Sequence, residues 1–100
     1  MQSENPVSIQ RSSHFNSYEV ADALIEAIVS ELDAVRLYSQ LARYIPDPDV
    51  VKLFMEVRQD ELRHVAMFLE ALKRIDPNVV KGLKEGIKEY KDLFGPSGII

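Results

Sequence analysis

The sequence contains no cysteine among its 100 residues. This absence excludes a disulfide scaffold, a zinc–thiolate site, a rubredoxin-type iron centre and a thiol nucleophile. No apolar run approaches the roughly 20 residues that a membrane-spanning helix needs. The polar segment 1–16 also lacks the apolar core of a secretory signal. We therefore expect a cytoplasmic protein with no membrane partner.

The chain also has no excess of positive charge, because 12 Lys and Arg stand against 16 Asp and Glu, a formal net charge of −4. Proteins that bind nucleic acid usually present a basic face, so we expect no nucleic-acid partner. The length suggests one domain. Two long helices enclose little volume by themselves, which favours association with further copies of the chain.

Three helices are indicated, with no strand pattern. Residues 1–16 lack periodicity and are expected to form a flexible N-terminal arm. Asn16 and Glu19 have the spacing of a capping box that begins a helix at residue 17. A stripe with heptad spacing follows and contains one carboxylate among apolar side chains: Leu24, Ile28, Glu31, Val35, Tyr38 and Ala42.

The segment Pro46-Asp47-Pro48 ends this helix, because each proline disfavours helical geometry in the residue before it. Asp47 or Asp49 can cap a second helix, which is expected to reach residue 75. Its stripe again contains polar side chains: Phe54, Val57, Glu61, His64, Phe68, Ala71 and Ile75.

Asp76-Pro77 repeats the stop and start signals, and Gly95-Pro96 ends a shorter third helix. Its expected apolar face consists of Val80, Leu83, Ile87, Tyr90 and Phe94. The chain is thus expected to be all-α, with an antiparallel two-helix hairpin and a short C-terminal helix. We expect a helical domain at 17–95 and a short tail or linker at 96–100.

The carboxylates on these stripes indicate a site. A charge on a core-facing stripe is unfavourable unless it is compensated, and Glu-x-x-His places two metal-capable side chains on one helix face. Measured from the hairpin turn at about 1.5 Å per residue, Glu31, Glu61 and His64 lie at roughly 24, 21 and 26 Å. An antiparallel pair would therefore bring the three side chains together.

This set is half of a known arrangement. Ferritin-like di-iron proteins combine a Glu from each of two helices with a Glu-x-x-His from each of two others. The third helix offers no second set, because Glu85 and Glu89 have no histidine nearby. A two-fold dimer would double the ligands and complete a four-helix bundle. Iron and manganese both accept carboxylate and imidazole ligands.

The residues that carry these ligands resemble the encapsulated ferritins, ferritin-like proteins housed within encapsulin shells. The resemblance covers roughly residues 28–77 and rests on the segments 31–38 and 58–64. It implies a two-helix protomer that dimerises to complete a ferroxidase centre, with dimers assembled into a ring-shaped decamer. The chain differs from the well-known bacterial members of this family at three positions. Ser30 stands where they have an acidic residue, Asp33 where they have Glu, and Leu37 where they have Trp.

By the same resemblance, Glu31, Glu61 and His64 are ligands of two iron ions per dimer, and Tyr38 is the aromatic neighbour of the centre. These four are the expected catalytic residues. The resemblance implies oxidation of Fe(II) to Fe(III) inside an encapsulin nanocompartment, whose shell would store the iron.

Two other functions use the same residues. A rubrerythrin-like peroxide reductase would share the ligands but would need a separate electron donor, since the chain lacks cysteine. A non-catalytic helical assembly module would use them as a buried interface network. Simpler roles also exist for single residues: Tyr38 as a packing residue, and His14, Asp33 and Asp60 as solvated side chains.

Overall fold

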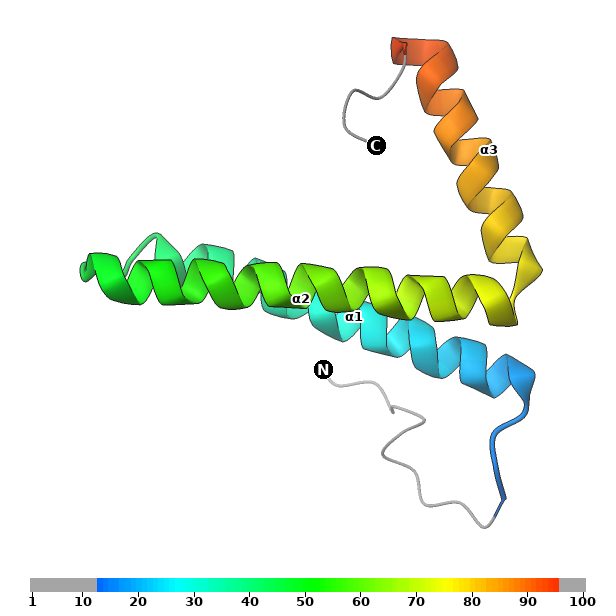
Figure 1. Cartoon of the computed structure of the whole chain (residues 1–100), viewed down its shortest axis with the longest axis horizontal. Coiled ribbons are helices and arrows are strands. Elements are labelled where there is room, and N and C mark those ends of the chain that lie inside the picture. The colour runs from blue at the N-terminus through cyan, green and yellow to red at the C-terminus, as the bar shows by residue number, and fades with distance from the viewer. Residues whose placement is uncertain (1–12, 96–100) are drawn as a thin grey trace.

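The computed structural model describes residues 13–95, and these form three α-helices without a strand. Helix α1 spans Ser17–Ala42, α2 spans Pro48–Ile75 and α3 spans Pro77–Phe94. The first two helices lie side by side as an antiparallel hairpin, and α3 turns away from its end (Figure 1). The all-α class and the three-helix order are as predicted. The expected arm and tail fall largely on residues 1–12 and 96–100, which lie outside the described residues.

Local signals explain where each helix begins. The Asn16 side chain accepts a hydrogen bond from the Glu19 amide, and Glu19 accepts one from the Asn16 amide, so the predicted capping box is present. Asp47 caps α2 by accepting from the amides of Asp49 and Val50. Asp76 caps α3 in the same way. These caps satisfy amides that have no partner within their own helix.

Little of the chain is buried. Within residues 13–95, the buried side chains are those of Ala21, which is 8% exposed, and Leu72, which is 4% exposed. The stripes of α1 and α2 face each other, but two helices cover only part of each other's apolar surface. A single copy is therefore an incomplete bundle, which agrees with the expectation that it associates.

Helix α3 packs against α2 alone among the described helices, and every residue from 81 to 94 is exposed. It ends at Gly95, whose φ of 85° lies in the region that glycine adopts without steric cost. None of the helices between residues 13 and 95 combines the length and the apolar character that crossing a membrane requires.

Candidate metal centre

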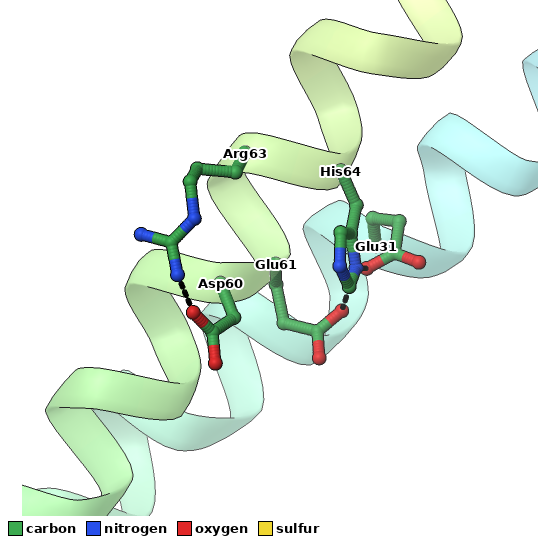
Figure 2. Close-up of polar contacts among 5 residues, drawn as sticks. All are labelled: Glu31, Asp60, Glu61, Arg63 and His64. Carbon is green, nitrogen blue, oxygen red and sulfur yellow. Dashed lines mark ion pairs between the residues drawn. The ribbon is translucent and has the colours of Figure 1, made fainter.

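Glu31, Glu61 and His64 form one group where α1 and α2 face each other near the middle of the hairpin. One ligand atom from each residue can be chosen so that all lie within 4.8 Å of one another. The Nδ1 atom of His64 is 3.4 Å from Oε2 of Glu31 and 3.6 Å from Oε2 of Glu61. Figure 2 shows Glu31 reaching from α1 toward the two side chains of α2. The convergence expected from the helix levels is present in the structure.

Helical geometry explains this convergence. Glu61 and His64 are separated by three residues, so they occupy the same face of α2 on successive turns. Glu31 belongs to the stripe of α1 that faces α2, and the antiparallel pairing places it between their levels. The three side chains thus meet because the inward-facing positions of α1 and α2 carry them at the same level along the hairpin.

The burial of this group is uneven. The side chains of Glu31 and Glu61 are 20% and 19% exposed, whereas that of His64 is 49% exposed. Oε2 of Glu31 is buried and, within the described part of the chain, has no hydrogen-bond partner. A buried carboxylate oxygen without a partner is costly. A bound cation would supply the missing compensation.

The donor set suits such a cation. Two carboxylates and an imidazole are ligands that iron and manganese accept. Ligands about 2.1 Å from a shared first-row ion lie at most about 4.2 Å apart. The spread of 4.8 Å in Glu31, Glu61 and His64 is close to this limit, so small side-chain movements would allow them to share an ion.

The neighbouring acids are compensated differently. Asp33 pairs with Arg36 at 3.0 Å, and Asp60 pairs with Arg63. In Figure 2 the Asp60–Arg63 pair lies apart from the Glu61–His64–Glu31 group. All four side chains are about half exposed or more, so these are surface pairs. The expectation that Asp33 and Asp60 face solvent agrees with the structure.

Tyr38 does not join the three candidate ligands. It lies seven residues from Glu31, about 10 Å along the helix. Its ring meets that of Phe54 edge-on, with centroids 5.7 Å apart. Together with Leu53 and Val57, these rings line a separate hollow of about 230 Å³. The structure therefore supports packing for Tyr38, while its catalytic role stays a prediction.

A second hollow, of about 330 Å³, is lined by Glu31, His64, Met67 and Phe68. Phe68 was part of the predicted stripe, but Met67 was not singled out from the sequence. Its position one turn after His64 was the signal that could have found it. In a single copy, the hollow adjoins the acid and the imidazole from one side.

The sequence also did not reveal a polar contact between the helices. Nε of Arg58 donates a hydrogen bond of 2.7 Å to Oγ of Ser39, and that hydroxyl donates to the carbonyl of Val35 at 2.8 Å. The bridge joins α1 to α2 on the turn-proximal side of the candidate ligands. It helps to fix the register that aligns Glu31 with Glu61.

An antiparallel helix pair with one Glu and one Glu-x-x-His defines half of a ferritin-like bundle. Comparison with known proteins identifies its family. Residues 11–90 match the EncFtn-like family, and the chain belongs to it. The predicted resemblance to the encapsulated ferritins is thereby confirmed.

Two curated relatives and one solved structure show the extent of the similarity. The chain is 41% identical over 95 residues to a ferritin-like–encapsulin shell fusion protein of Pyrococcus furiosus, and the match covers 95% of this chain and 28% of the relative. It is 30% identical over 73 residues to the encapsulin nanocompartment cargo protein EncC of Myxococcus xanthus, which covers 73% of this chain and 56% of that protein. The chain thus spans between about a quarter and just over half of the length of these relatives.

The crystal structure of the encapsulated ferritin domain from Pyrococcus furiosus superimposes with a TM-score of 0.86 at 40% identity. The match covers 96% of this chain and 98% of that one. The overall fold is therefore shared with a solved encapsulated ferritin domain.

Proposed function

We propose that this chain is a ferroxidase that oxidises Fe(II) to Fe(III) at a di-iron centre formed between two copies. The observation that carries the proposal is the group of Glu31, Glu61 and His64, in which a buried carboxylate oxygen lacks a hydrogen-bond partner. Membership of the EncFtn-like family supports iron as the metal. The incomplete burial of the hairpin supports the second copy.

Charge balance favours a pair of ions. One copy supplies two carboxylates, Glu31 and Glu61, and a two-fold dimer supplies four. Their combined negative charge equals the positive charge of two Fe(II) ions. Bringing four carboxylates together without compensation would be strongly unfavourable in a partly buried interface, so the dimer site favours the binding of cations.

The residues have distinct roles in this proposal. Glu31 and Glu61 would hold the iron ions and neutralise the positive charge that oxidation adds. Nδ1 of His64 would be the third metal ligand from each copy. The iron pair supplies two electrons, which with two protons reduce one dioxygen to hydrogen peroxide, or one hydrogen peroxide to two waters. The apolar side chains around the group would restrict bulk water and limit the escape of reactive species.

The names of the relatives support a setting for the activity. One is named as a fusion with an encapsulin shell and the other as a cargo protein of an encapsulin nanocompartment. We propose that this chain works within such a shell in the cytoplasm, as dimers assembled into a larger ring, and that the shell stores the oxidised iron. A decamer is the ring size that the family resemblance implies.

The test measures loss of Fe(II) with a ferrous chelator after anaerobic loading and addition of dioxygen or peroxide. We expect Glu61→Gln and His64→Ala to lose most of the oxidation rate. Glu70→Gln is the matched control, because Glu70 lies on the same helix, is 70% exposed and pairs with Lys73. Unchanged iron binding and oxidation in both ligand variants would refute the proposal. A rate much higher with peroxide, sustained only by an added reductant, would favour a peroxide reductase.

A further inference from the structure

Met67 is an exposed methionine next to the candidate metal ligands. The residue is 69% exposed, the largest value among the exposed large hydrophobic residues of α2. It follows His64 by three residues and lines the same hollow as Glu31 and His64. A thioether therefore stands beside the candidate ligands, in a hollow of about 330 Å³ that is open in a single copy.

The chain provides an internal comparison for this residue. Met55 is the other methionine of α2 and is 40% exposed. It precedes Glu61 by six residues and is not among the residues that line the hollow of Glu31 and His64. The two thioethers thus share a helix and solvent access, but only Met67 adjoins the candidate centre.

We propose that Met67 is an oxidation site, at which hydrogen peroxide formed at or admitted to the adjacent centre converts the thioether to the sulfoxide. This inference rests on the proposed function. A sulfur lone pair attacks one oxygen of the peroxide and the O–O bond breaks. The sulfur is oxidised by two electrons and the peroxide is reduced, with its second oxygen leaving as water after proton transfer.

The sulfoxide would change the surface on which a second copy is expected to dock. Oxidation converts a flexible apolar side chain into a polar one, which disrupts apolar interfaces. Because Met67 lies on the same face as the candidate ligands, its oxidation weakens the pairing of hairpins. The centre would then lose activity when peroxide accumulates, and reduction of the sulfoxide would restore it.

The test compares Met67 with Met55 in the same protein by peptide mass spectrometry, which detects the gain of one oxygen atom. One sample oxidises Fe(II) with dioxygen in the presence of catalase, which removes peroxide from bulk solution. A second is metal-free protein treated with added peroxide, which gives the baseline set by exposure. A third is Glu61→Gln treated with iron and dioxygen.

We expect the ratio of Met67 to Met55 oxidation to be several-fold higher during iron oxidation than in the metal-free baseline, and to return to the baseline in Glu61→Gln. An equal ratio in the first two samples, while Fe(II) is oxidised normally, would overturn this inference alone. Failure of the wild-type protein to oxidise Fe(II) in the chelator assay would overturn the proposed function and this inference with it.

A second measurement follows the rate of Fe(II) oxidation over successive additions of iron. For each protein, the rate after each addition is divided by the rate after the first. Met67→Leu removes the thioether but keeps an apolar side chain of similar volume. Met55→Leu is its matched control. We expect activity to decline more slowly in Met67→Leu than in the wild type, and at the wild-type rate in Met55→Leu. Identical decline in all three proteins would overturn the regulatory part of the inference.

Discussion

Oε2 of Glu31 and Nδ1 of His64 lie 3.4 Å apart across the interface between α1 and α2. The carboxylate is 20% exposed and the imidazole 49%, so the acid lies inside the hairpin and the histidine at its margin. The hairpin thus holds a carboxylate oxygen and an imidazole nitrogen close together within a single copy. Such preorganisation reduces the ordering cost of binding a metal.

Metal binding should stabilise the folded protein through this group. A metal at a hundred times its dissociation constant adds about 2.7 kcal/mol to the free energy of unfolding. We expect Fe(II) under anaerobic conditions, or Mn(II), to raise the melting temperature of the wild type. Glu31→Leu should abolish this shift while raising the metal-free free energy of unfolding by about 1–3 kcal/mol, because it removes a buried oxygen that lacks a hydrogen-bond partner. Thermal and urea unfolding measure both effects.

Asp33→Asn is the control for that experiment. Asp33 lies on the same helix, but its carboxylate is exposed and paired with Arg36. The metal-dependent shift in melting temperature should persist in this variant. A shift that survives in Glu31→Leu would contradict the assignment of Glu31 as a ligand.

Activity should depend on association. In the proposed site, the candidate ligands of one copy would make half of a di-metal set, so we expect the specific activity for Fe(II) oxidation to fall on dilution, as oligomers dissociate by mass action. Analytical ultracentrifugation at the same protein concentrations would show whether the two curves coincide. A monomer with full specific activity would contradict the shared site.

Tyr38→Phe distinguishes a catalytic role of the Tyr38 hydroxyl from a packing role of its ring. The substitution removes the hydroxyl and keeps the ring that meets Phe54 edge-on. If the hydroxyl takes part in oxidation, as the family resemblance implies, the oxidation rate falls several-fold while the free energy of unfolding changes by less than about 1 kcal/mol. Stopped-flow oxidation and urea unfolding give the two values. An unchanged rate would leave Tyr38 as a packing residue.

The bridge between Arg58 and Ser39 should contribute more to stability than a surface ion pair. Ser39→Ala removes the acceptor of a charged donor in a partly buried position, and we expect a loss of about 1 kcal/mol or more in the free energy of unfolding. The matched comparison is Arg36→Ala, which breaks an exposed pair and should cost within about 0.5 kcal/mol. Equal losses in the two variants, measured by urea unfolding, would contradict a special role for the bridge.

The helices were predictable because their signals are local. Asn16, Asp47 and Asp76 cap the three helices through amides two or three residues away, and the prolines that follow Asp47 and Asp76 preset the first turn. These interactions form within a few residues of chain. The spacing of Glu31, Glu61 and His64 was predictable for a related reason, since a fixed rise per residue converts sequence distance into height.

The contact between Tyr38 and Phe54 was harder to foresee. Tyr38 shares a stripe with Glu31, but its ring direction depends on Phe54, which comes from the other helix. The position of Met67 beside Glu31 depends in the same way on the crossing of α1 and α2. Periodicity assigns a residue to a face, whereas packing between distant segments selects its contacts.

The sequence by itself determined three helices, their caps, and an acid and an imidazole at matching heights, because all of these follow from short-range steric and hydrogen-bonding rules. Only the tertiary structure decided which oxygen of Glu31 is buried without a hydrogen-bond partner, that Ser39 and Arg58 connect the helices, and that α3 leaves the hairpin. These features depend on the angle and separation of whole helices. That geometry arises from the packing of side chains far apart in the chain.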